Sequence, residues 1–165
     1  MNAVEQLATD QYLTFALAND VFAIDVIKTR EVLDFAEVTK VPQTPDYMLG
    51  VINLRGSVVP IIDMRVKFGM NKVELTRDSS IIVVEIDVDG EPVTIGALVD
   101  EVCEVLDMDA SQIEQSPRIG TKLNNEFISG MGNLADKFVI ILDINKVFTA
   151  NELVTALEGS GQDEE

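Results

Sequence analysis

The chain of 165 residues has a formal net charge of −17, and 47% of its residues are hydrophobic. This apolar content indicates a folded chain, and the excess of acids argues against nucleic acids or anionic membrane surfaces as partners. Histidine is absent and Cys103 is the single cysteine, which excludes histidine-based catalysis, histidine-ligated zinc and a disulfide framework. With no signal peptide and no apolar run of membrane-spanning length, a cytoplasmic protein without membrane insertion is expected.

Apolar alternation and turn residues predict that most of the chain forms strands. The expected strands are residues 12–17, 21–24, 51–54, 57–62, 80–88, 93–98, 102–106, 127–134 and 138–142. Asp25 is expected to cap a short segment over 27–33, and Asp89-Gly90 to form a two-residue hairpin turn.

Short helical segments and loops separate these strands. Residues 46–49 are interpreted as one helical turn that Gly50 ends, and Asp63 is expected to cap a short helix over 64–68. Asn145 is expected to cap a last helix. Polar segments are interpreted as a linker, a loop and a frayed acidic tail, at residues 70–78, 111–118 and 159–165.

An internal repeat relates the two halves of the chain. Residues 49–68 align without a gap over residues 129–148, and residues 21–24 have a weaker partner in 93–95. The aligned identities include glycine, Asn-Leu, isoleucine, aspartate and phenylalanine, at Gly50/Gly130, Asn53/Asn133, Leu54/Leu134, Ile61/Ile141, Asp63/Asp143 and Phe68/Phe148. The repeat predicts two small β-units of about five strands each, and units this short hide their sheet edges best as barrels.

The two copies of the repeat differ at Arg55. The Asn-Leu pair recurs, but Ala135 stands where the first copy has Arg55. The turn therefore does not need an arginine, and a role for Arg55 beyond folding is inferred. Glu31 is its expected partner, because arginine makes forked hydrogen bonds to carboxylates. The alternative is an ordinary surface ion pair, which contributes little to stability.

Other candidate sites are weaker. Residues 87–91 resemble a calcium loop, but the strand that follows favours a hairpin turn. Gly130-Met131-Gly132 lacks the third glycine of a phosphate-binding loop. Cys103 is interpreted as a small core residue, and Asp107 and Asp109 as ordinary acidic side chains. No catalytic residue, metal site or cofactor is expected.

The segment around Arg55 resembles the signature of the CheW family of chemotaxis coupling proteins. The match is carried by GVINLRG at residues 50–56 and by VVPIIDMR and Lys67-Phe68 after it. Supporting matches are Phe22-Ala23-Ile24-Asp25, Arg30-Glu31-Val32, Pro42 with Pro45, and Gly130-Met131-Gly132. Ala23 departs from the family, which often has glycine there.

The resemblance implies a mostly β fold of two intertwined five-stranded SH3-like barrels, with short helices and a C-terminal helix. Residues 11–150 would form one CheW-like domain with barrels at about 20–70 and 80–145 and partly exchanged strands, and 1–10 and 151–165 would be extensions. The implied function is a non-catalytic adaptor between the cytoplasmic tip of methyl-accepting chemoreceptors and the regulatory domain of the histidine kinase CheA, recruited to membrane-associated arrays. Further copies of the adaptor would be partners in rings.

The family's receptor-coupling surface corresponds to six positions of this chain: Arg55, Glu31, Asn53, Gly56, Ile27 and Thr29. The resemblance assigns no kinase-contact residue. Two alternatives stay open on the residues alone. A small acidic enzyme would require two carboxylates that converge in an apolar pocket, and a ligand-binding sensor would require a cavity between the barrels.

Overall fold

The computed structural model describes residues 9–34, 38–71, 75–114, 127–134 and 137–148. The predicted tail, the second half of the predicted loop, part of the linker, residues 1–8 of the N-terminal extension and all of the C-terminal extension lie outside these residues. The elements are β1 (Thr9–Leu17), β2 (Asp20–Asp25), η1 (Val26–Lys28), β3 (Thr29–Asp34), β4 (Met48–Leu54), β5 (Ser57–Asp63), α2 (Met64–Lys67), β6 (Ser80–Val88), β7 (Glu91–Val99), β8 (Glu101–Asp109), η2 (Ala110–Gln112), β9 (Ile113–Glu114), β10 (Ile128–Leu134), β11 (Lys137–Leu142) and α3 (Ile144–Phe148).

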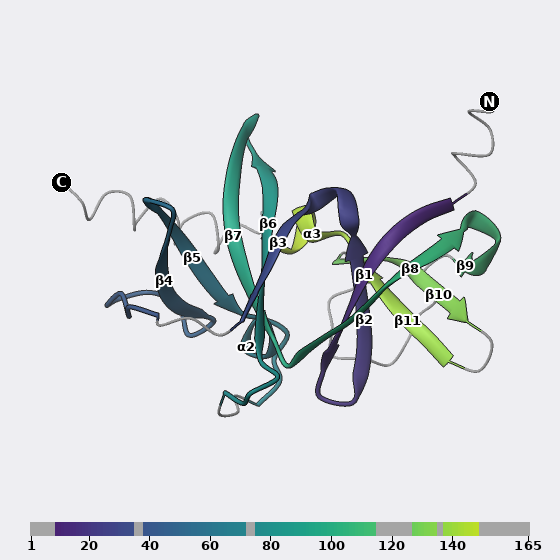
Figure 1. Ribbon diagram of the computed structural model, residues 1–165, viewed down its shortest axis with the longest axis horizontal. Helices are drawn as coiled ribbons and strands as arrows, with labels where there is room; N and C mark the ends of the chain where they lie inside the picture. The colour runs from purple at the N-terminus through teal and green to yellow at the C-terminus, as the bar shows by residue number, and fades with distance from the viewer. Residues whose placement is uncertain (1–8, 35–37, 72–74, 115–126, 135–136, 149–165) are drawn as a thin grey trace.

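These strands form two sheets, as Figure 1 shows. We call the sheet β8-β1-β2-β11-β10-β9 sheet A and the sheet β3-β6-β7-β5-β4 sheet B. Most neighbours are antiparallel, and β11 with β2 and β5 with β7 are the parallel pairs. Each sheet takes strands from both halves of the chain, because β1 and β2 join strands β8–β11, while β6 and β7 join strands β3–β5.

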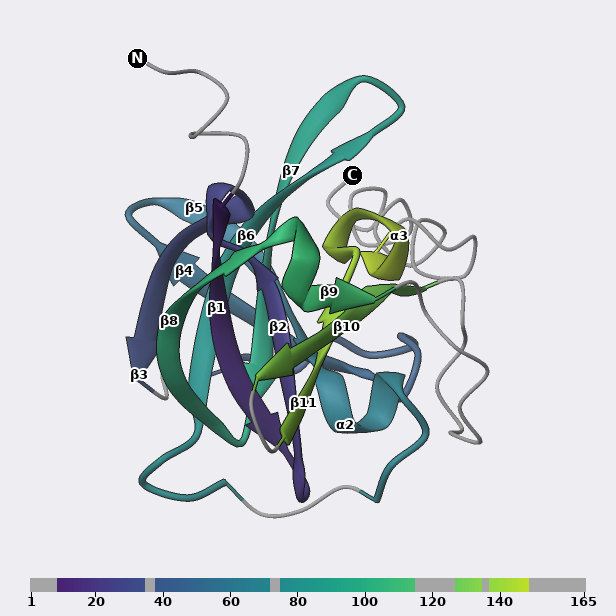
Figure 2. The same cartoon turned by 90° about the vertical axis from the view of Figure 1, so that its right-hand side faces the viewer.

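The mostly β fold class is confirmed. The pairing in each sheet runs from one edge strand to the other, and among the described strands no ladder closes the sheet into a complete barrel. Figures 1 and 2 show the β6–β7 hairpin extending beyond the rest of both sheets. Its turn is the predicted one, since Asp89 and Gly90 both have positive φ, at 53° and 85°.

Three predictions of local structure are wrong. Residues 46–49 are not a helical turn, because β4 begins at Met48. Asn145 does not cap α3; it lies within the helix, and the Asp143 side chain accepts the Lys146 N–H at 3.2 Å. Cys103 is exposed on β8 and is not a core residue.

The structure also explains the repeat. The β4–β5 and β10–β11 hairpins have the same register at an offset of 80 residues, with a bulge before Gly50 in one and before Gly130 in the other. The Cβ of an alanine at Gly50 would lie 2.3 Å from the Thr39 carbonyl oxygen, and at Gly130 it would lie 3.0 Å from that of Glu114. A neighbouring backbone therefore excludes a side chain at Gly50 and crowds one at Gly130.

The strand pairing draws attention to a second repeat in the sequence. Edge strand β3 of sheet B pairs with β6, and edge strand β8 of sheet A pairs with β1. At an offset of 73 residues, the Glu-Val-Leu-Asp of residues 31–34 in β3 recurs in β8 at residues 104–107. Glu31 and Glu104 are thus equivalent positions on the two edge strands.

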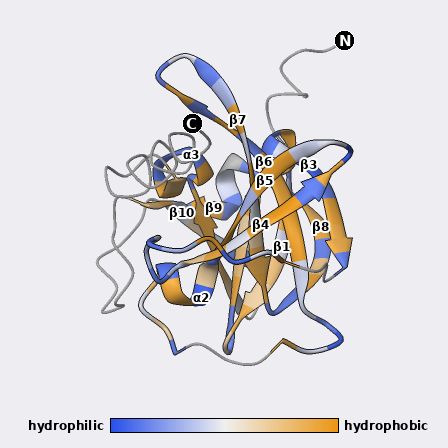
Figure 3. Ribbon diagram, turned by 90° about the vertical axis from the view of Figure 1, so that its left-hand side faces the viewer, coloured by the Kyte–Doolittle hydropathy of each residue, from blue (hydrophilic) through white to orange (hydrophobic). Residues whose placement is uncertain are grey.

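The core has three parts. The largest is shared by both sheets, and four phenylalanine rings lie along it, with centroids of successive rings 5.9, 5.9 and 6.3 Å apart: Phe15, Phe22, Phe68 and Phe127. A smaller apolar cluster lies within each sheet, around Ile61 in sheet B and Ile141 in sheet A. Figure 3 shows hydrophobic residues along the strands and hydrophilic ones towards the hairpin ends. The shared core makes the two sheets one packed body.

Candidate functional site

The β4–β5 turn determines where Arg55 projects. Leu54 pairs with Ser57, so Arg55 and Gly56 form a two-residue hairpin loop. Their φ angles are 52° and 87°, which is the pattern of a type I′ turn. The Asn53 Oδ1 accepts the Gly56 N–H at 2.9 Å and braces the loop. Asn53 and Gly56 therefore build the corner that holds the Arg55 side chain outward.

Arg55 binds Glu31 with both branches of its guanidinium. The Nη1–Oε2 distance is 2.5 Å and the Nη2–Oε1 distance is 2.9 Å. Glu31 lies on β3 and Arg55 follows β4, and these strands are the two edges of sheet B. The expected Arg55–Glu31 pair is thus present, and it links the two edges where no backbone ladder joins them.

The pair is ionised and accessible. The hydrogen bond from Arg55 lowers the pKa of the Glu31 carboxyl, and the same bond raises the pKa of the Arg55 guanidinium. The Arg55 side chain is 72% exposed and that of Glu31 is 26% exposed. An exposed pair adds little to folding stability, but its forked geometry fixes the guanidinium in one orientation.

Ile27 and Thr29 lie where the chain passes from sheet A to sheet B. The Asp25 Oδ1 accepts the Ile27 N–H at 3.0 Å and starts the short helix η1, in which the Ile27 side chain is 74% exposed. Thr29 begins β3, two residues before Glu31. Within the described part of the chain, neither residue has a recorded hydrogen bond or ion pair to Arg55 or Glu31.

The Thr29 hydroxyl is unusual. Its Oγ1 is buried and has no hydrogen-bond partner among the described residues. At the 73-residue offset its equivalent is Val102, so this strand position does not need a hydroxyl. A buried hydroxyl without a partner is unfavourable, so contacts within the described chain do not explain the threonine at this position.

Two further ion pairs were not foreseen from the sequence. Arg30 pairs with Glu85 across β3 and β6, and Arg65 pairs with Asp100. The first borders a cavity of about 200 Å³ that is also lined by Ile27, Lys28, Ile86, Asp87 and Pro92. In the second pair, Asp100 is the residue equivalent to Ile27 at the 73-residue offset. This equivalence could have been found from the sequence.

The geometry offers no support for acid–base catalysis. Among the described residues, the pKa is lowered in the carboxyls of Glu31, Asp100 and Asp109, whereas a general acid at neutral pH needs a raised pKa. In Asp109 the cause is the hydrogen bond from Ser111. The described residues contain no group of three acids or cysteines that could hold a metal ion. No helix among them is long and apolar enough to span a bilayer.

Comparisons with known proteins show which family and which fold this chain resembles. The family model of the CheW-like domain matches residues 11–152. Chemotaxis protein CheW of Klebsiella aerogenes is 37% identical over 143 residues, which cover 87% of this chain and 84% of that protein. Chemotaxis protein CheW of Rhizobium meliloti is 29% identical over 153 residues, with 92% and 96% covered. The crystal structure of the scaffolding protein TtCheW from Thermoanaerobacter tengcongensis superposes with a TM-score of 0.76 and 34% identity, and it covers 87% of this chain and 94% of that one.

Proposed function

The chain belongs to the CheW family of chemotaxis proteins, and from this premise we propose that it is a non-catalytic adaptor. It couples methyl-accepting chemoreceptors to the histidine kinase CheA, with residues 11–150 acting as one domain. It works in the cytoplasm, at membrane-associated receptor arrays. The structural likeness to the scaffolding protein TtCheW supports this role.

The observation that carries the proposal is the Arg55–Glu31 pair. The type I′ turn would accept asparagine or glycine at position 55 more readily than arginine. The second copy has Ala135 at that position. Arg55 is nevertheless held outward by its turn and oriented by Glu31. We assign the receptor-coupling surface to this pair, to the corner residues Asn53 and Gly56, and to Ile27 and Thr29 on the crossover into β3.

The partners follow from the same assignment. The regulatory domain of CheA and the cytoplasmic receptor tip are the expected protein partners, with further copies of this chain in the same rings. A net charge of −17 disfavours nucleic acid. Exposed apolar side chains on β5, β8 and β11 offer candidate contacts for the kinase: Val58, Val105 and Phe138.

The test is reconstitution of receptor-controlled kinase activity. Purified kinase and receptor tips are assayed for autophosphorylation with and without this protein, and then with Arg55→Ala. Wild type should activate the kinase in a receptor-dependent way, and Arg55→Ala should lower that activation at least about tenfold. Arg77→Ala, which removes an exposed arginine outside the site, is the matched control. A wild-type protein that binds neither partner would refute the proposal.

A further inference from the structure

The chain crosses between the two sheets at two equivalent places. One crossover is η1 between β2 and β3, and the other is Asp100 between β7 and β8. The 73-residue offset that aligns β3 with β8 also places Ile27 opposite Asp100. The 80-residue offset of the hairpins places Asn145 opposite Arg65. The two crossovers can therefore be compared residue by residue.

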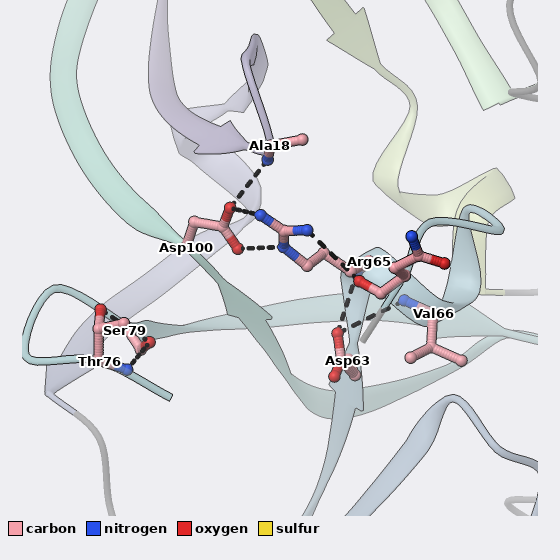
Figure 4. A network of polar contacts seen from close by, with 8 residues as sticks. Ala18, Asp63, Arg65, Val66, Thr76, Ser79 and Asp100 are labelled. Atoms are coloured by element: carbon pink, nitrogen blue, oxygen red, sulfur yellow. Dashed lines mark hydrogen bonds and ion pairs between the residues drawn. The ribbon is translucent and has the colours of Figure 1, made fainter. Parts of the chain in front are cut away.

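The crossover at Asp100 is tied to both sheets, as Figure 4 shows. Arg65, in the helix that follows β5 of sheet B, donates from Nε and Nη2 to the two Asp100 carboxylate oxygens at 2.7 and 2.6 Å. The Ala18 N–H, in the β1–β2 turn of sheet A, donates to Asp100 Oδ2 at 2.8 Å. The Asp100 N–H donates to the Ala16 carbonyl at 3.1 Å. We call this set of contacts the Asp100 clasp.

The clasp is better shielded than the other ion pairs of the described chain. The side chains of Arg65 and Asp100 are 17% and 26% exposed, and the guanidinium also donates to the Asn71 carbonyl at 3.3 Å. Asp63, the residue that caps α2, accepts the Arg65 N–H at 3.0 Å and fixes the start of the helix from which Arg65 projects. These contacts hold the guanidinium in one place.

The crossover at η1 has a weaker tie, which Asn145 of α3 makes to Asp87 of β6. Ile27 points into solvent, and its N–H is bonded locally to Asp25. Asn145, at the position of Arg65, bonds both the N–H and the carbonyl of Asp87, at 2.8 and 3.3 Å. Within the described residues no hydrogen bond is recorded from Val26–Lys28 to the backbone of β6 or β7. The cavity of about 200 Å³ lies between η1 and these strands.

We infer that the Asp100 clasp fixes the two sheets to each other at one crossover, and that Val26–Lys28 is a hinge at which the angle between sheets A and B changes while the shared core stays packed. The inference follows from the unequal bonding of two equivalent crossovers. Hinges are short segments that absorb backbone change while packed elements move as bodies. The proposed contact residues Ile27 and Thr29 lie at or next to Val26–Lys28. Partner binding is therefore coupled to the angle between the sheets; this last step rests on the proposed function.

Amide hydrogen exchange and a distance measurement test the hinge. In wild type, the Ala18 and Asp100 amides should exchange at least about tenfold more slowly than those of Val26–Lys28. Spin labels on Cys103 of sheet A and on Asp34→Cys of sheet B then report the distance between the sheets. Arg65→Ala should remove the protection at Ala18 and Asp100 and broaden the distance distribution. An unchanged distribution after loss of that protection would overturn the inference, as would equal protection at both crossovers in wild type.

Conservative variants keep the test valid if Arg65→Ala does not fold. Arg65→Lys keeps the charge but loses the forked contact, and Asp100→Asn keeps an acceptor for Ala18 but loses the charge. Both should broaden the distribution less than Arg65→Ala. For the coupling, Arg65→Ala should change receptor-tip affinity at least about threefold. Unchanged affinity with broadened distances would refute the coupling alone, whereas absence of binding by wild type would refute the proposed function and leave the hinge result standing.

Discussion

At the scale of the residue, Arg55 occupies a backbone conformation that its own side chain disfavours. Its φ of 52° lies in the left-handed region, where any Cβ approaches the backbone closely. Asparagine and glycine are the usual residues at such positions of type I′ turns. Because its pair with Glu31 is exposed, ion pairing does not offset this cost by much. The arginine is therefore best explained by the proposed contact of its guanidinium with a receptor.

Arg55→Asn separates folding from binding. Asparagine adopts the left-handed conformation more easily, so the Tm should stay level or rise by up to about 4 °C, while receptor-dependent kinase activation is lost. Calorimetry and the reconstituted assay measure the two effects. Gly56→Ala is the structural control, because φ is 87° there and alanine should cost about 1–2 kcal/mol. A large drop in the Tm of Arg55→Asn would show that Arg55 is structural.

The Glu31 carboxyl gives a pH prediction. Its pKa in the folded protein is lowered, chiefly by the hydrogen bond from Arg55. The ion pair is therefore fully formed above the ordinary pKa of a glutamate and is lost as pH falls through the lowered value. Arg55→Gln should raise the pKa of Glu31 towards that ordinary value. Carboxyl carbon shifts followed by NMR during an acid titration measure it, and an unchanged midpoint would contradict the pair.

At the scale of the element, each of the two repeated hairpins depends on a glycine that lets a third chain segment approach closely. Gly50 lies against Thr39, which bridges to Val51, and Gly130 lies against Glu114 of β9. In each hairpin the bulge brings the glycine under a neighbouring carbonyl oxygen. The recurrence of glycine in the sequence therefore reports a close backbone approach, and not the end of a helix as residues 46–49 suggested.

Gly50→Ala should destabilise the fold strongly. The new Cβ would lie 2.3 Å from the Thr39 carbonyl oxygen, and φ there is 153°. We expect a loss of about 3 kcal/mol or more in the free energy of unfolding, measured by urea denaturation. Gly130→Ala is the matched variant and should cost less, because its nearest atom is a side-chain methyl of Ile113 at 2.9 Å. Equal costs would show that the Thr39 bridge is not the cause.

Sequence patterns predicted the strands well because alternation and turn residues are local signals. The strand at Ser80–Val88 and the turn at Asp89-Gly90 are examples. The prediction of a helical turn at 46–49 was wrong because a contact between separate segments, the Thr39–Val51 bridge, determines the conformation at Gly50. The prediction that Cys103 is a core residue was wrong because the apolar sequence does not show whether a strand lies at the edge or in the middle of a sheet, and β8 is an edge strand. The Arg55–Glu31 pair was predictable because the repeat itself marked Arg55 as dispensable for the turn.

At the scale of the whole molecule, the sequence shows a duplication but not how its copies share strands. The copies follow each other along the chain, whereas each sheet combines strands of both. Exchange of this kind requires two crossovers between the sheets. The two crossovers are related by the duplication, and one has Ile27 where the other has Asp100. Asp100 binds Arg65 and joins the sheets at its crossover, whereas Ile27 cannot make such a contact.

Transplanting the clasp tests this relation. Ile27→Asp combined with Asn145→Arg places the Asp100 and Arg65 side chains at the equivalent positions of the η1 crossover. The new guanidinium can make a forked ion pair with the new carboxylate, as Arg65 does with Asp100. We expect the amides of Val26–Lys28 to exchange at least about tenfold more slowly and the spin-label distances between the sheets to narrow. Ile27→Asp alone is the control and should do neither. If the double variant folds with unchanged exchange at Val26–Lys28, the freedom of that crossover does not come from the missing clasp.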